Sequence, residues 1–142
     1  MAFEVKQLND ALGAEILGLD LSAPIDDETF AAVHRAHLDH LVLVFRNQSL
    51  TPERQIEFSK RFGPLDRHPA EDATLSDHPE ILLVSTRKRN GQYIGLPDAG
   101  PMWHSDISYK KETSLGSMLY AIEVPDRGGA TGFANMYAAY DS

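Results

Sequence analysis

The sequence predicts a mixed α+β fold that is mainly β, and three observations lead to this prediction. Short apolar runs rich in Val, Ile and Leu recur along the chain between Gly, Pro, Asn and Asp residues, which is typical of strands. Segments with helical spacing and a capping residue are fewer and fall mainly in the first half. No repeat, low-complexity tract or linker interrupts the sequence, so we expect one domain over residues 1–142.

The first part of the chain is expected to contain two strands, a helix and a further strand. Apolar residues within 3–21 form two short β-type runs separated by a turn rich in Asn, Asp and Gly. Asp26 or Asp27 can cap a helix over about 28–40. The continuous apolar run 41–45 (LVLVF) predicts a strand that is buried on both faces.

A second helix is predicted within the stretch SLTPERQIEFSKRFGPL. Thr51 is a good N-cap residue, and Pro52 suits the first helical turn because it needs no hydrogen-bonded N–H there. Phe58 and Phe62 are four residues apart and would share one face of this helix. Gly63 and the proline that follows it are expected to end the helix.

The remainder of the chain is expected to be mostly extended. A polar loop is predicted over 66–79, and Asn90-Gly91 predicts a hairpin turn. The other expected elements, in order, are strands at 81–86, 117–125 and 131–135 and a helix that begins near 136.

The composition restricts the classes of partner and site. Twenty-one acidic residues against thirteen basic ones give a net charge of −8, which argues against nucleic acid and anionic membranes as partners. The absence of cysteine excludes disulfides, thiolate metal sites and a thiol nucleophile. We find no signal-peptide pattern at the N-terminus and no apolar run long enough to span a bilayer. These features predict a cytoplasmic protein.

The stretch GPMWHSDISY, residues 100–109, carries a candidate metal site. In an extended chain, residues two apart point to the same side, so His104 and Asp106 can present an imidazole and a carboxylate to one ion. Two histidines and one carboxylate form the facial triad of non-haem Fe(II) oxygenases, of which this pair would supply two members. A His-x-Asp pair alone is a weak signal, and taken alone it favours a loop histidine beside a capping aspartate.

Other readings of the histidines remain open at this point. His34, His37 and His40 recur every three residues on the first predicted helix, and His34 and His37 could share a face and hold a metal. The stretch lacks the Glu and spacing of the H-E-x-x-H zinc helix, which favours a partly solvated helix flank instead. A metal-dependent hydrolase that uses the His-x-Asp pair is a further alternative.

Four segments, taken together and in order, resemble the TauD/TfdA family of Fe(II)- and 2-oxoglutarate-dependent dioxygenases. They are GAEILGLDLS, LVLVFRNQSLTPERQIEFSKRFGPL, MWHSDISY and AIEVPDRGGATGFANMYAAYD. The resemblance covers nearly all of residues 1–142 and corresponds to the N-terminal half of family members. It implies part of a double-stranded β-helix (jelly-roll) core with flanking helices. It also implies hydroxylation of a small anionic substrate, a sulfonate, sulfate ester or carboxylate, with succinate and CO₂ as co-products and Fe(II), 2-oxoglutarate and O₂ as cofactor and co-substrates.

The resemblance also assigns roles to individual residues. His104 and Asp106 match two of the three iron ligands. Thr131, in the GGAT turn, matches the threonine that donates a hydrogen bond to the 2-oxoglutarate carboxylate, and a hydroxyl suits that task. His68 matches a histidine that reaches the acidic group of the substrate in taurine-oxidising members. The alternatives are an ordinary strand residue for Thr131 and a solvated loop histidine for His68.

The chain departs from the family pattern in its C-terminal part. The family's third ligand is a histidine far toward the C-terminus, followed by an arginine that pairs with 2-oxoglutarate, but no histidine follows His104 here and Arg127 is the only later arginine. We therefore expect a chain that is incomplete at its C-terminal end. Exposed sheet edges and self-association as a homo-oligomer would follow. A fragment that acts only by assembly with another chain is the alternative to an independent enzyme.

The substrate-contacting positions also differ from those of taurine-oxidising members. Glu71 stands where the family has a tyrosine, and Gly100 stands where it has an asparagine. A carboxylate near a sulfonate would repel it, so taurine itself is disfavoured. Other anionic small molecules stay open.

Overall fold

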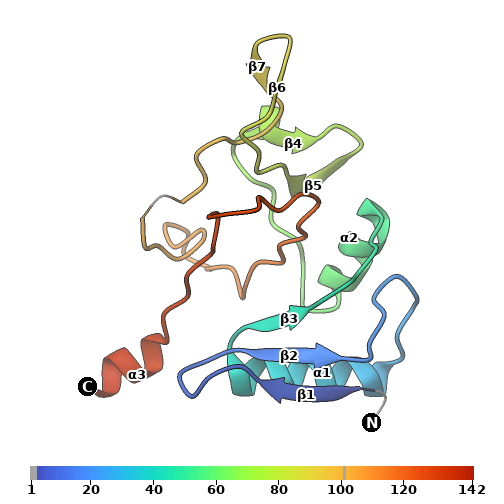
Figure 1. Ribbon diagram of the computed structural model, residues 1–142, viewed down its shortest axis with the longest axis vertical. Coiled ribbons are helices and arrows are strands. Elements are labelled where there is room, and N and C mark those ends of the chain that lie inside the picture. Colours follow the sequence, from blue (N-terminus) through green and yellow to red (C-terminus); the bar gives the residue numbers. More distant parts are fainter. Residues whose placement is uncertain (1–2, 101) are drawn as a thin grey trace. The chain divides into compact units, whose positions relative to one another are not determined.

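The computed structural model describes residues 3–100 and 102–142, so Pro101 of the GPMWHSDISY stretch lies outside the described residues. The chain divides into two compact units, and each is described by itself. The first unit comprises Met1–Leu50 and Ala121–Ser142, and the second comprises Thr51–Tyr120. Helices and strands are mixed in the chain, with more strands than helices among the described residues (Figure 1).

A three-stranded sheet in the order β1-β2-β3 forms the centre of the first unit. β1 (Glu4–Gln7) pairs antiparallel with β2 (Ala14–Leu17), and β2 pairs parallel with β3 (Leu43–Phe45). The parallel pair requires a crossover connection, which α1 (Asp27–His40) supplies. This arrangement confirms the predicted two strands, helix and strand of the first fifty residues.

The core of the first unit lies between this sheet and α1. β2 alternates buried and half-buried residues, so that Ala14 and Ile16 are buried, and Val33 and Ala36 are the buried residues of α1. Asp26 caps α1 as expected, because its carboxylate accepts a hydrogen bond from the Thr29 N–H.

The strand predicted for LVLVF is shorter and less buried than expected. β3 covers only Leu43–Phe45, and all three residues are half-buried. β3 is the last strand of the sheet, so among the described strands one of its edges has no partner, and α1 packs against it.

The first helix of the second unit is α2 (Pro52–Lys60). Thr51 caps it, because its hydroxyl oxygen accepts a hydrogen bond from the Arg54 N–H. Phe58 is buried and meets Phe62 edge to face at a ring-centroid distance of 5.6 Å. α2 ends at Lys60, earlier than the predicted end at Gly63, so Phe62 lies beyond the helix. α2 packs against β5 (His78–Leu82), which pairs antiparallel with β4 (Thr74–Leu75).

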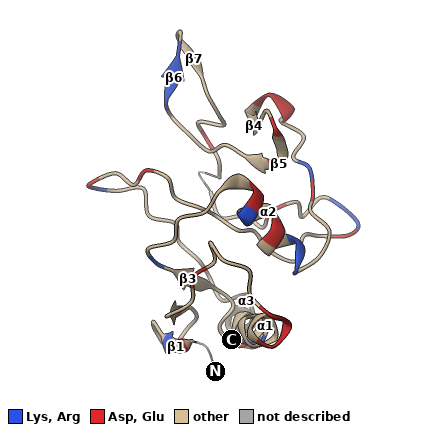
Figure 2. Cartoon of the chain, turned by 90° about the vertical axis from the view of Figure 1, so that its right-hand side faces the viewer, with Lys and Arg blue, Asp and Glu red and all other residues tan. Residues whose placement is uncertain are grey.

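A small hairpin in the same unit confirms the predicted Asn90-Gly91 turn. β6 (Lys88–Arg89) and β7 (Gln92–Tyr93) are antiparallel, and the turn residues have φ of 52° and 82°. The basic β6 is the blue strand of this hairpin in Figure 2. None of the helices within the described residues is long and apolar enough to cross a membrane.

Several sequence-based expectations for the later part of the chain are wrong. The segment 66–79 is not all loop, because it contains the 3₁₀ helix η1 (Glu71–Ala73), β4 and the start of β5. β5 therefore begins and ends earlier than the predicted strand 81–86. The segments 117–125 and 131–135 are not strands, and apolar side chains such as Ile122 and Val124 are exposed.

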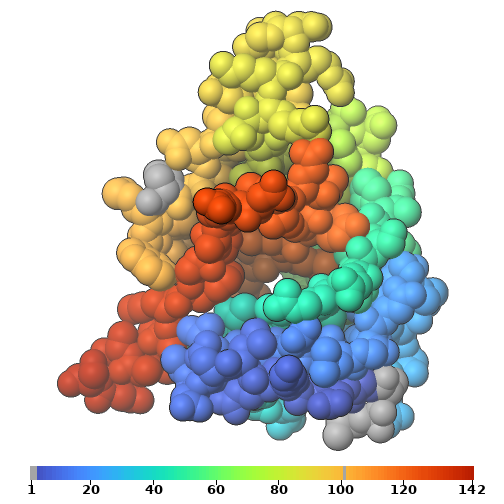
Figure 3. Space-filling model, in the orientation of Figure 1, coloured from blue at the N-terminus to red at the C-terminus, as the bar shows by residue number. Residues whose placement is uncertain are grey.

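The physical reason is that a strand is stable only when its backbone groups are paired, and no described strand pairs with either segment. The final helix is confirmed as α3 (Met136–Asp141), with Asn135 as its cap. Figure 3 shows the atoms of this last segment, 121–142, at the red end of its colour bar. The described strands form three separate small sheets, so the jelly roll stays a prediction.

Candidate functional site

His104 and Asp106 lie side by side at the start of a turn in the second unit. The turn spans 106–109, and residues 103–105 before it belong to no helix or strand. The distance from His104 Nε2 to Asp106 Oδ1 is 3.1 Å, and each side chain is about half exposed, at 51% and 53%. The predicted pair is thus brought together, although by a turn rather than by a β-strand.

The backbone fixes the orientation of the His104 ring. Its Nδ1–H donates to the carbonyl oxygen of Met102 at 2.7 Å, which leaves Nε2 to face Asp106. Because the Asp106 carboxylate can only accept, Nε2 meets it through a proton or through a metal ion in the proton's place. A carbonyl partner on the other ring nitrogen is the usual arrangement of a metal-binding histidine.

Gly100 leaves the space that this ring occupies. A Cβ atom at Gly100 would lie only 2.2 Å from Cε1 and 3.0 Å from Nε2 of His104. The Gly100 backbone also has a positive φ of 71°, which favours glycine. No feature of the sequence could indicate this contact, because it depends on how the loop folds back.

The electrostatics of the pair favour a positive charge between its two facing atoms. The pKa of His104 is raised above its ordinary value, first by the hydrogen bond to the Met102 carbonyl and then by the Asp106 carboxylate. A proton or a metal ion can satisfy the same arrangement of one nitrogen and one carboxylate oxygen.

The second carboxylate oxygen of Asp106 has a partner of its own. The Ser117 hydroxyl donates to Asp106 Oδ2 at 2.5 Å. Ser117 lies eleven residues further along the chain, at the start of the segment that the sequence predicted as a strand. Sequence reasoning missed this contact, since nothing in the local pattern pairs these two residues.

The geometry of the pair fits two neighbouring ligands of one metal ion. Imidazole and carboxylate donors bind first-row dications at about 2.1 Å, so donors at adjacent corners of an octahedron are about 3.0 Å apart. The observed separation of 3.1 Å is compatible with this value and is also that of an ordinary hydrogen bond. No group of three or more His, Cys, Asp or Glu side chains within residues 3–100 and 102–142 is placed to hold a metal. The pair therefore supplies two ligands only.

The three histidines of the first helix all lie on α1, and no group of three that includes them is placed to hold a metal among the described residues. A two-histidine site at His34 and His37 stays a hypothesis. The pKa of His37 is lowered, chiefly by burial and then by the charge of His34. The helix therefore holds these histidines as a partly buried flank.

The loop that follows Asp106 is tied to the segment that carries His68. Lys110 Nζ forms an ion pair with Asp66 Oδ1 at 2.7 Å, and the Ser114 hydroxyl donates to Asp66 Oδ2 at 2.9 Å. Asp66 thus connects two points of the 107–116 loop to the residues just before His68. The pKa of Asp66 is lowered, first by the hydrogen bond from Lys110 and then by that from Ser114.

His68 is half-buried in the second unit, the unit that also contains His104 and Asp106. Its Nδ1 accepts a hydrogen bond from the Ala70 N–H at 3.1 Å. The neutral ring therefore carries its proton on Nε2, which can donate to an anionic group. This tautomer suits the predicted role in substrate binding.

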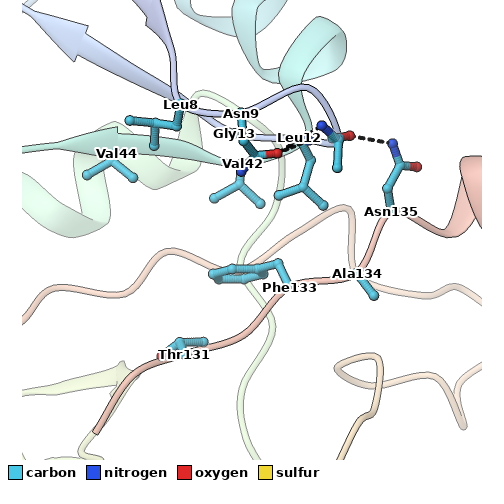
Figure 4. Close-up of a pocket in the computed structure, with 11 residues that line it drawn as sticks. Leu8, Asn9, Leu12, Gly13, Val42, Val44, Thr131, Phe133, Ala134 and Asn135 are labelled. Atoms are coloured by element: carbon cyan, nitrogen blue, oxygen red, sulfur yellow. Dashed lines mark hydrogen bonds between the residues drawn. The ribbon is translucent and has the colours of Figure 1, made fainter. Parts of the chain in front are cut away.

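Thr131 belongs to the first unit, whereas His68, His104 and Asp106 belong to the second. Together with Phe133 and Asn135 it lines an open pocket of about 560 Å³ beside the β1–β2 turn (Figure 4). Asn135 Nδ2 donates to the Ala11 carbonyl oxygen at 2.7 Å, which holds the 131–135 segment against that turn.

Comparison with known proteins identifies the family of the chain. Residues 4–142 match the family described as taurine catabolism dioxygenase TauD, TfdA family. The chain belongs to this family. Its relatives include pentalenolactone F synthase of Streptomyces avermitilis, which is 39% identical over 93% of this chain and 44% of the relative.

Two further relatives extend this comparison. The (S)-phenoxypropionate/alpha-ketoglutarate-dioxygenase of Sphingobium herbicidovorans is 35% identical over 99% of this chain and 48% of the relative. The crystal structure of a taurine dioxygenase from Burkholderia xenovorans is 36% identical and superposes with a TM-score of 0.51 over 56% of this chain and 28% of that one. The chain thus spans about half the length of the curated relatives that it matches.

Proposed function

We propose that this protein acts as an Fe(II)- and 2-oxoglutarate-dependent dioxygenase that hydroxylates a small anionic organic molecule. The observation that carries the proposal is the His104–Asp106 pair, whose facing atoms are 3.1 Å apart, in a chain of the TauD/TfdA family. Neither observation alone is sufficient. His-x-Asp pairs are common, and family membership does not establish that the ligand residues of a given chain are arranged to bind a metal.

In this proposal, His104 Nε2 and Asp106 Oδ1 hold the iron. The Met102 carbonyl keeps the His104 ring in the tautomer that binds metal. Iron bound there would activate O₂ together with 2-oxoglutarate, with succinate and CO₂ as co-products. Thr131 would donate its hydroxyl to a carboxylate of 2-oxoglutarate, and His68 would donate Nε2–H to the anionic group of the substrate.

The proposal needs a third protein ligand, and no third side chain joins the pair among the described residues. We infer that this ligand comes from further residues of the same protein or from a second chain. The complete jelly-roll core that the family resemblance implies would bring it into place, with the described small sheets as part of that core.

The substrate is expected to be an anion other than taurine. The relative named as acting on (S)-phenoxypropionate supports a carboxylate. A sulfate ester or another sulfonate remains in the proposal. Glu71, at the first position of η1, is the residue that disfavours a taurine-like sulfonate.

The test is succinate formation from 2-oxoglutarate by the complete protein, with Fe(II), O₂ and a panel of carboxylates, sulfonates and sulfate esters. His104→Ala and Asp106→Ala should each abolish the succinate that depends on added substrate. Ser105→Ala is the matched control, because Ser105 lies between the two ligands in the sequence and is expected to face away from the metal. Activity that survives either ligand substitution would refute the assignment.

A second candidate function is that of a partner in an assembly. Large apolar side chains are exposed in the later part of the chain, including Leu119 at 70%, Ile122 at 80% and Tyr140 at 91%. Such surface favours association with further protein. Light scattering of the purified protein, combined with the succinate assay, distinguishes the two cases. A protein that is monomeric at micromolar concentration and still forms succinate would exclude a requirement for assembly.

A further inference from the structure

The two oxygens of the Asp106 carboxylate have different environments. Oδ1 faces His104 Nε2 at 3.1 Å, whereas Oδ2 accepts a hydrogen bond from the Ser117 hydroxyl at 2.5 Å. A hydrogen bond from a hydroxyl to an ionised carboxylate belongs to the charge-assisted class, which is about twice as strong as a neutral hydrogen bond. Only one of the two oxygens is therefore directed at the position where a metal would meet His104.

Ser117 is held in place from outside the ligand pair. The next residue, Met118, is half-buried, and its Sδ accepts a hydrogen bond from the Ser59 hydroxyl of α2 at 3.1 Å. The loop between Asp106 and Ser117 is fixed separately through Lys110 and Asp66. Ser117 thus reaches Asp106 from a backbone that α2 positions independently of the His104 loop.

We propose that Ser117 is a positioning residue that restricts Asp106 to binding the metal through Oδ1 alone. This inference rests on the proposed function, because it presupposes that His104 and Asp106 are ligands. Its chemical consequence is that Asp106 occupies one coordination position. A carboxylate that chelated through both oxygens would occupy two and would leave one fewer for a co-substrate.

The experiment measures Mn(II) binding to the complete protein, which includes the third ligand, from the electron paramagnetic resonance signal of free Mn(II). Ser117→Ala should raise the dissociation constant for Mn(II) about 10- to 100-fold, as for other residues that orient a metal ligand. Ser117→Thr keeps the hydroxyl and should bind like the wild type. Ser114→Ala is the matched control, since it removes a serine hydroxyl of the same loop that is bonded to Asp66 instead.

An infrared difference spectrum of ¹³C-aspartate-labelled protein with and without Mn(II) supplies a second readout. The separation of the two carboxylate stretching bands is larger for one-oxygen binding than for chelation. We expect a large separation in the wild type and in Ser117→Thr, and a smaller one in Ser117→Ala. A merely structural role of Ser117 would not change this separation.

His104→Ala separates failure of the proposed function from failure of this inference. If the wild type binds no Mn(II), or if His104→Ala binds it equally well, the ligand assignment is wrong and the inference is overturned with it. If His104→Ala loses binding while Ser117→Ala matches Ser114→Ala, only the role of Ser117 is overturned. Weaker binding by Ser117→Ala with unchanged carboxylate bands would overturn one-oxygen binding.

Discussion

Replacement of Gly100 by alanine should disable the metal site without unfolding the protein. The added Cβ would lie 2.2 Å from Cε1 of His104, and ordinary contact begins at 3.4 Å, so the ring must retreat by about 1 Å. A displacement of this size in a positioned group reduces function on the order of 100-fold. We therefore expect Gly100→Ala to weaken Mn(II) binding by about that factor.

The control for this substitution is Gly91→Ala in the β6–β7 turn. Gly91 has a similarly positive φ of 82°, but nothing lies within 4 Å of its missing Cβ. Both variants should lose about 1 kcal/mol of unfolding free energy in urea titrations, because both force alanine into a left-handed conformation. Only Gly100→Ala should lose metal affinity. Equal Mn(II) affinities in the two variants would refute the argument that Gly100 provides the space for the His104 ring.

Three further predictions concern the parts of the fold that support the site. Val33 of α1 is 0% exposed, so Val33→Ala should lower the unfolding free energy by about 2 kcal/mol, measured by urea denaturation; a loss near zero would show that the α1–sheet core is wrongly assigned. The pKa of His37 is lowered in the folded protein, so the unfolded chain binds a proton more readily. Stability should then be full above pH 6.5 and fall as the pH decreases through the folded-state pKa, and His37→Gln should flatten this dependence in urea midpoints. Asp66→Ala should release the 107–116 loop and speed hydrogen exchange there by mass spectrometry, whereas unchanged exchange would show that the ion pair with Lys110 does not hold the loop.

The sequence was most informative where local chemistry decides the structure. The caps Asp26 and Thr51, the Asn90-Gly91 turn and the start of α3 were all predictable, because each depends on residues within a single turn. The segment 117–125 shows the opposite case. Its apolar, β-branched composition suits a strand, but a strand also needs a neighbour to pair with, and pairing is decided by the fold as a whole.

The candidate site divides in the same way. His104 and Asp106 could be identified from their spacing and from the family resemblance, and they are close in the structure. The reason given for their proximity was only partly correct, since a turn and not an extended strand brings them together. The contacts of Gly100 and Ser117 were beyond sequence reasoning, because they arise from the folding of the loop on itself over four and eleven positions.

These contacts explain how an exposed pair of ligands can be ordered before any metal binds. Both side chains are about half exposed, so burial alone would leave them free to choose rotamers. Instead, the Met102 carbonyl fixes the ring nitrogen, Gly100 leaves room for the ring, and Ser117 holds the far oxygen of Asp106. All of these groups lie within residues 100–117 of the second unit. The two ligands of the described pair are therefore oriented by contacts within a short stretch of the chain. The remaining ligand has only to approach a pair that is already oriented.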